Sequence, residues 1–268
     1  MDPDPARNRR TYFNHPLVTE SLQTLPAALQ HPTAAAFRDY VVEHVPQNSL
    51  KGRKRIARDL VQRFSEGGQM NLSLAAAISR FGESRIAREI LCFELLRAMP
   101  LLQEIATLWL AQLPEEGAPR SSLMTFLAPR LPGRSIEKVT KDSLTTFKQC
   151  GKLRSPRIAW FQPVWSPPPI EAFLYVLARL CPEHTMVRVE LFSVLPILRG
   201  LLWPQSSIED LLRQAKAAGH VTKISRLDQY HQFTLAGSGH ERLRLLLPEQ
   251  MAAADRATQF ELRPPEGD

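Results

Sequence analysis

Apolar residues recur at helical spacing through the first 112 residues of the chain. In RIAREILCFELL, which follows Ser84, the positions Ile86, Ile90, Phe93 and Leu95 or Leu96 would lie on one side of a helix. Alanine, leucine and arginine are abundant, and proline or glycine separates the segments. The pattern predicts helices over 17–30, 33–45, 48–66, 71–80, 83–96 and 99–112. We therefore expect a helical bundle domain over 15–117, preceded by a flexible arm over 1–14 and followed by the turn-rich LPEEGAP.

The next segment predicts a helix followed by a hairpin. A short helix is expected over 121–131, and a second over 136–150, which Ser135 would cap at its start and Gly151 would end. Five apolar residues share one side of this second helix: Ile136, Val139, Leu144, Phe147 and Cys150. Five polar residues lie opposite: Arg134, Lys138, Lys141, Thr145 and Lys148.

After the glycine, the residues favour two short strands. Residues 152–154 and 158–161 would pair across a Ser155-Pro156 turn, and prolines at 167–169 would close the unit. Helix, glycine and basic hairpin in this order are typical of a winged helix-turn-helix, in which the helix enters the major groove and the wing contacts phosphates. We expect such a domain over 118–169.

The remaining chain repeats this order with balanced charge. Helices are expected over 170–181 and 187–203, then IEDLLRQAKAAG as a third helix and a hairpin around Leu227-Asp228-Gln229. We interpret 170–240 as a C-terminal helical, second winged-helix-like unit with a structural or partner-binding role, followed by a tail over 241–268. The expected fold class is mainly α: a helical bundle, a winged-helix-like unit and a C-terminal helical segment with a small β-hairpin.

The positive charge is concentrated in two segments. The formal net charge is +7, yet Lys51–Arg63 alone holds six basic residues and one acidic residue, and Arg120–Arg157 holds nine and two. On the predicted helix over 48–66, Lys51, Lys54, Arg55 and Arg58 gather away from the apolar side, and only Arg55–Asp59 is spaced to pair at i, i+4. Like charges on one face repel each other, and a polyanion would remove that repulsion.

Other kinds of chemistry find no support in the residues. The chain has no phosphate-cradling glycine motif, no nucleophile elbow and no Cys/His spacing suited to zinc. Its three cysteines are far apart, which indicates a reducing compartment. The longest apolar run, 191–203, is too short to span a bilayer and contains Pro196 and Arg199. We expect no catalytic residues, no metal, no cofactor, no small-molecule substrate and no membrane, and a cytoplasmic location.

The order of the parts resembles the BrxA family of bacterial BREX phage-defence systems. The resemblance rests on LKGRKRIARDLVQRF, SRIAREILCFELLRAMPLLQEIATLWL and SIEKVTKDSLTTFKQCGKL, and more loosely on PPIEAFLYVLARL and FTLAGSG, within about residues 12 to 240. It implies a mostly helical, two-domain protein that binds DNA as an accessory to phage restriction or host methylation. An older description of that family as inner-membrane proteins finds no support in this sequence.

The sequence thus predicts a non-enzymatic accessory protein that binds double-stranded DNA with weak sequence specificity. The residues expected to contact DNA are Lys51, Lys54, Arg55, Arg58, Arg134, Lys138, Lys141, Thr145, Lys148, Lys152, Arg154 and Arg157. Other proteins of the same defence operon are possible partners. Two alternatives stay open: an RNA-binding or transcription-regulatory helical protein, and a scaffold that binds acidic protein partners.

Overall fold

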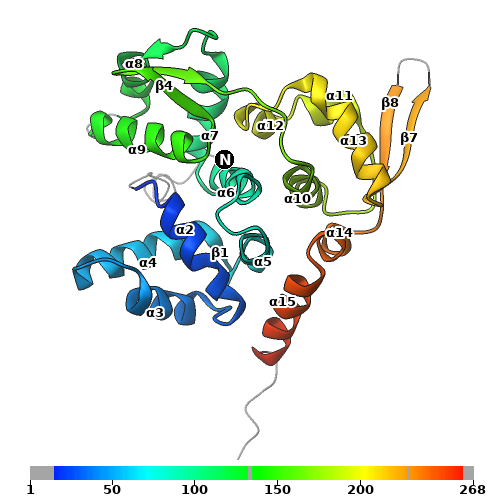
Figure 1. Cartoon of the computed structure of the whole chain (residues 1–268), viewed down its shortest axis with the longest axis horizontal. Coiled ribbons are helices and arrows are strands. Elements are labelled where there is room, and N and C mark those ends of the chain that lie inside the picture. The colour runs from blue at the N-terminus through cyan, green and yellow to red at the C-terminus, as the bar shows by residue number, and fades with distance from the viewer. Residues whose placement is uncertain (1–14, 132–134, 228–229, 262–268) are drawn as a thin grey trace, which may run out of the picture.

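Most of the chain is helical, as the hydrophobic pattern predicts (Figure 1). The computed structural model describes residues 15–131, 135–227 and 230–261, so the arm expected over 1–14 lies outside the described residues. The N-terminal bundle consists of α2 (Val18–Thr24), η1 (Leu25–Leu29), α3 (Ala34–His44), α4 (Leu50–Phe64), the short strands β1 (Ser65–Glu66) and β2 (Gln69–Met70), α5 (Leu72–Phe81), α6 (Arg85–Ala98), α7 (Pro100–Glu104), the π-helical turn η2 (Ile105–Trp109) and η3 (Leu110–Gln112).

Local sequence signals explain where these helices begin. The side chains of Thr33, Ser49, Asn71 and Ser84 each accept a hydrogen bond from a backbone N–H in the first turn of the helix that follows. Such caps satisfy donors that have no partner within the helix. The predicted helix positions are therefore confirmed to within a few residues.

Helix α6 lies at the centre of the molecule. Nine of its fourteen residues are buried, including the carboxylate-bearing Glu89 and Glu94. It contacts α2, α4 and α5 of the bundle and also α10 and α12 of the C-terminal half. A helix buried on nearly all sides must satisfy its polar side chains internally, and both glutamates do so through contacts described below.

The second part of the chain forms a helix pair beside a small antiparallel sheet. Its elements are β3 (Ala118–Pro119), α8 (Arg120–Leu127), η4 (Ala128–Arg130), α9 (Ile136–Gln149), β4 (Leu153–Arg157) and β5 (Trp160–Pro163). The strand order is β3-β5-β4. The edge strand β3 therefore pairs with β5, although both helices lie between these two strands in the sequence.

The hairpin turns three residues later than predicted. Arg157 pairs with Trp160, which places the turn at Ile158 and Ala159, and Ser155-Pro156 lies inside an irregular stretch of β4. Proline is tolerated on such an edge strand because the missing N–H is not needed by a neighbour. The turn prediction was wrong because Ser-Pro favours a turn only locally. Here the pairing of β4 with β5 continues past it to Arg157.

A third part repeats the same order of elements. It contains α10 (Ile170–Leu180), β6 (Met186–Arg188), α11 (Val189–Ser193), α12 (Pro196–Gly200), η5 (Gln205–Ser207), α13 (Ile208–Ala217), β7 (Val221–Leu227) and β8 (Tyr230–Leu235), with strand order β6-β8-β7. The single helix predicted over 187–203 was wrong. Residues 186–188 pair with β8 instead, and Pro196 begins a new helix because its ring cannot continue the preceding one.

Residues expected to form a tail are helical as far as they are described. Helices α14 (Gly239–Leu246) and α15 (Pro248–Glu261) follow the second sheet, and α15 packs against α5 of the bundle. Ser238 and Glu241 form a capping box at the start of α14. No helix among the described residues is long and apolar enough to cross a membrane.

Candidate nucleic-acid interface

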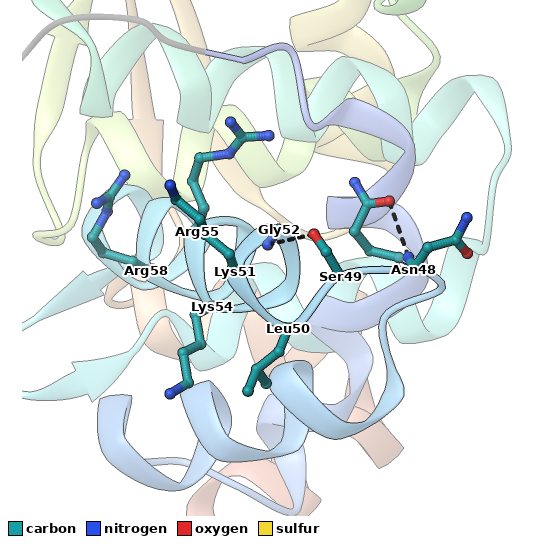
Figure 2. A pocket seen from close by; sticks show the side chains of 9 residues that line it. Asn48, Ser49, Leu50, Lys51, Gly52, Lys54, Arg55 and Arg58 are labelled. Atoms are coloured by element: carbon teal, nitrogen blue, oxygen red, sulfur yellow. Dashed lines mark hydrogen bonds between the residues drawn. The ribbon is translucent and has the colours of Figure 1, made fainter.

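The first half of α4 presents a basic face to solvent. We call Lys51, Lys54, Arg55 and Arg58 the α4 basic face; all four are exposed. Together with Gln47, Asn48, Ser49, Leu50 and Gly52 they line an open groove of about 750 Å³ (Figure 2). Lys51, Lys54 and Arg55 form no hydrogen bond or ion pair with any residue that the structure describes. Their charges are therefore available to a ligand.

The acidic residue of this helix neutralises a different arginine from the one predicted. Asp59 accepts from Arg58, with 2.9 Å between Nη2 and Oδ1, whereas we expected it to pair with Arg55. The Arg58 side chain is still 65% exposed, whereas the Asp59 side chain that it pairs with is buried. The Nε and Nη2 of Arg58 are bonded to Asp59, so the exposed part of the guanidinium can reach a phosphate while the pair stays intact.

Two other arginines of α4 serve the fold. Arg53 donates to the backbone oxygen of Val42, and Arg63 donates to the backbone oxygens of His15 and Pro16. Burial lowers the pKa of Arg63 to about 10, against the opposing charge of Asp59. Arg63 therefore stays protonated at neutral pH but faces the protein interior.

The position of the α4 basic face on its helix is unfavourable for stability. The N-terminal end of a helix carries a partial positive charge and is stabilised by anions. The first turn of α4 contains no acidic residue and does contain Lys51. The Gly52 N–H in this turn donates to Ser49 Oγ (Figure 2), 3.1 Å away. A bound anion would neutralise both the partial positive charge at the start of the helix and the repulsion among the basic side chains.

Helix α9 carries a second basic face. Lys138, Lys141 and Lys148 are exposed, and we call these three the α9 basic face. Lys148 lies over the ring of Phe161, 4.9 Å from its centroid. Thr145 is half-buried and its hydroxyl donates to the backbone oxygen of Lys141, so it is less available than predicted. Arg134 lies outside the described residues.

The hairpin adds two further cations. Arg154 and Arg157 are exposed, as expected for a wing, and the Arg157 guanidinium stacks over Trp160 at 4.1 Å from the ring centroid. Lys152 must be removed from the predicted site. Its side chain is fully buried, and its Nζ donates to both carboxylate oxygens of Glu89 at 2.7 and 2.6 Å. A lysine held in this way cannot reach a phosphate.

One residue of each basic face acts on the charge of His15. Burial lowers the pKa of His15, and the positive charges of Arg55 and Lys138 lower it further. Arg55 and Lys138 are thus both near enough to His15 to act on its charge. Figure 1 shows α4 and α9 on the same side of the molecule with the start of α2 between them, and α2 contacts α9. The sequence could not show that α4 and α9 share one side of the molecule, which a single duplex in contact with both would require.

A buried acid lies beneath the α9 basic face. Burial raises the pKa of Asp142, while the positive charges of Lys138, Lys141 and Arg63 act in the opposite direction. Sequence reasoning counted this residue only as charge. It also missed Gln47 and Asn48 in the groove, whose sole signal is that they directly precede the cap of α4.

A second cavity is lined in part by the residues of an ion-pair network. It measures about 480 Å³, and its lining includes Arg97, Arg179 and Glu94. The Glu94 carboxylate accepts from Arg179 at 2.9 Å, from Tyr175 at 2.8 Å and from Arg97 at 3.3 Å. Burial and the nearby Glu94 charge raise the pKa of Tyr175, which stays a neutral donor. This network joins α6 to α10. Among the described residues, no group of three or more His, Cys, Asp or Glu side chains could hold a metal ion.

Comparisons with known proteins indicate the fold and no more. No protein-family model matches the chain, and no curated protein matches it. A solved structure titled "Magnesium ion-bound SspB crystal structure" is similar with a TM-score of 0.59 and 11% identity, covering 92% of this chain and 88% of that chain. A structure titled "SspB crystal structure" has a TM-score of 0.46 and 13% identity, covering 65% of this chain and 61% of that chain. The first of these likenesses extends over nearly the whole chain, so it indicates a similar overall fold.

Proposed function

We propose that this protein binds double-stranded DNA through the phosphate backbone, using the α4 and α9 basic faces together with Arg154 and Arg157. The observation that carries this proposal is that α4 and α9, which both present exposed cations, lie on the same side of the molecule (Figure 1). The two faces and the hairpin together carry nine exposed cations, and among the described residues only Arg58 has an acidic partner. Duplex DNA is a polyanion of matching charge density.

We infer that the part over 118–163 acts as a winged helix. The support is its order of elements, a strand, two helices and a hairpin, and its strand order β3-β5-β4. In this class of domain the second helix enters the major groove and the hairpin contacts the backbone. Helix α9 would be the recognition helix, and β4–β5 the wing.

The interface chemistry favours affinity over sequence reading. Base edges are read chiefly by Arg, Asn and Gln, whereas the exposed cations of α9 are lysines, which act as point charges toward phosphates. Gln149 lies at the end of α9, and one of its polar atoms is buried. We therefore propose weak direct sequence specificity.

We further propose that the protein is an accessory without catalytic activity in a phage-defence system of the BREX type. The support for this role is the resemblance of its segments to the BrxA family. Other proteins of the same system would then be partners, and the second winged-helix-like part, with balanced charge, is a surface suited to them.

Competition binding tests the choice of polymer. A labelled duplex of arbitrary sequence is bound first, and unlabelled DNA duplex or structured RNA of equal length is added at the same salt concentration. Binding to DNA with weak displacement by RNA supports the proposal. Equal displacement favours the RNA-binding alternative, since A-form RNA presents a different groove. An absence of binding near 0.1 M salt, together with stable co-purification of an acidic protein, favours the scaffold.

A further inference from the structure

The most exposed large apolar side chain among the described residues is at the turn of the β4–β5 hairpin. Ile158 is 99% exposed, whereas the other exposed large hydrophobic residues range from 41% to 59%. Its side chain contributes nothing to packing, so the fold does not need an isoleucine at this position. Two-residue hairpin turns ordinarily use Asn, Asp or Gly.

The turn is held firmly by its neighbours. Arg157 pairs with Trp160 across the turn and also stacks on its ring. The Trp160 indole N–H donates to the Glu116 backbone oxygen at 2.6 Å, and the Ser155 hydroxyl donates to the Trp160 backbone oxygen at 2.9 Å. Ala159 occupies the left-handed region with φ 54°, which further restricts the turn. Ile158 therefore projects from a supported tip.

The hairpin segment that carries Ile158 is basic. Between Leu153 and Val164 the chain contains Arg154 and Arg157 and no acidic residue, and both arginines are exposed. An apolar side chain flanked by cations fits a partner that has an anionic exterior and an apolar interior. Duplex DNA has this character, because phosphates surround the stacked bases. The hairpin is continuous with the α9 basic face, which favours DNA over an anionic lipid surface.

We propose that the β4–β5 hairpin inserts Ile158 as an apolar wedge between adjacent base pairs of bound DNA and thereby bends the duplex. This inference rests on the proposed function and names the deformation that accompanies it. Apolar wedges of this size unstack a base step from the minor groove and kink the helix. The cost of unstacking depends on sequence and is lowest at TA and CA steps. The protein would therefore prefer flexible steps without contacting base edges.

Two fluorescence readouts test the wedge with the full chain. A duplex of about 30 base pairs, well below the persistence length of about 150 base pairs, carries a donor and an acceptor at its two ends. A second set of duplexes carries 2-aminopurine beside a central TA step, because this base brightens when it is unstacked. Each duplex is titrated with the protein, with Ile158→Ala and with Leu245→Ala, which shortens another exposed aliphatic side chain on α14.

The expected result is a rise in end-to-end energy transfer and in 2-aminopurine fluorescence with the protein and with Leu245→Ala. Ile158→Ala should lose both signals while its affinity falls by less than about tenfold, since the phosphate contacts remain. If the protein binds the duplex without either signal, or if Ile158→Ala still bends it, the wedge is refuted and the proposed function survives. If no duplex is bound, the proposed function itself fails. Ile158-dependent binding to anionic vesicles by a protein that leaves DNA straight would assign the tip to a lipid surface instead.

Discussion

The ammonium group of Lys152 lies 2.6 Å from a carboxylate oxygen of Glu89, and both side chains are buried. The same oxygen of Glu89 accepts a hydrogen bond from the Trp203 indole at 3.1 Å. One carboxylate on α6 thus joins the segment after α9 to the segment before α13. This contact ties the segment after α9 to helix α6 at the centre of the molecule, whereas Lys138 and Lys141, nearer the start of α9, are exposed.

Breaking this pair should strongly destabilise the protein. Lys152→Met leaves the Glu89 carboxylate buried with only Trp203 as a donor. Removing one partner of a buried ion pair typically costs about 3–5 kcal/mol. We expect the free energy of unfolding, measured by urea denaturation, to fall by about that amount.

A double variant separates charge from packing. Glu89→Gln with Lys152→Met keeps an acceptor for Trp203 and removes both charges. It should recover most of the lost stability, because a neutral replacement of a buried pair is often tolerated. A double variant as unstable as the single one would show that the charges themselves are not what Lys152 contributes.

Charge reversal on α9 should weaken DNA binding without unfolding the protein. Lys138→Glu with Lys141→Glu removes two exposed cations, and each lost phosphate contact lowers the steepness of the log–log salt dependence by about 1. We expect a loss of affinity of at least about tenfold and a slope shallower by about 2. Arg213→Glu with Lys216→Glu, on the exposed side of α13, is the matched control. Equal weakening by both pairs would mean that overall charge, and not the α9 basic face, determines binding.

Lys51 offers a test in which stability and binding change in opposite directions. Lys51→Glu places an anion in the first turn of α4, where the helix dipole favours it by about 0.3–1 kcal/mol. The melting temperature should rise slightly while the affinity for duplex DNA falls. Differential scanning calorimetry and binding titrations on the same preparation check both. A variant that is less stable and binds as well as the parent would contradict the role given to the α4 basic face.

His220 should make the fold sensitive to mild acid. Its ring is buried, and burial together with the charge of Arg242 lowers its pKa from 6.5 to about 4. As the pH drops below about 6.5, His220 becomes protonated in the unfolded chain but stays neutral in the folded chain. The free energy of unfolding therefore falls as the pH drops from about 7 toward 4. The loss due to this residue is about 2 kcal/mol at pH 5.

The control for this effect is His220→Gln. Urea denaturation at pH 7 and pH 5 should show a smaller loss of stability on acidification for the variant than for the parent. If the parent and the variant lose the same amount, the pKa of His220 is not depressed in the folded protein.

Short-range signals in the sequence predicted the helices well. Ser135 and Gly151 mark the ends of α9, and Ser49 marks the start of α4, because caps and glycine turns act within a few residues. The exposure of Lys51 and Lys138 also followed from helical periodicity. These features depend on neighbours in the chain and need no knowledge of the tertiary fold.

Contacts between distant segments could not be predicted in this way. Lys152 looked like a wing residue because its partner Glu89 lies 63 positions earlier. Strand β6 looked helical because its pairing partner, β8, follows more than forty residues later. The placement of α4 and α9 on one side of the molecule depends on the packing of α2 against α9. In each case a contact between segments far apart in the chain determined the structure, and the local sequence pattern did not reveal it.

The central claim is that the α4 and α9 basic faces bind the same DNA duplex at the same time. The most direct test measures fluorescence anisotropy of a labelled duplex at several salt concentrations for the parent, for Lys51→Gln/Lys54→Gln/Arg55→Gln, and for Lys138→Gln/Lys141→Gln. We expect a steep slope for the parent, at about 0.9 per phosphate contact, and a shallower slope for each variant. A parent slope near zero, or a slope unchanged when either face is neutralised, would contradict the claim.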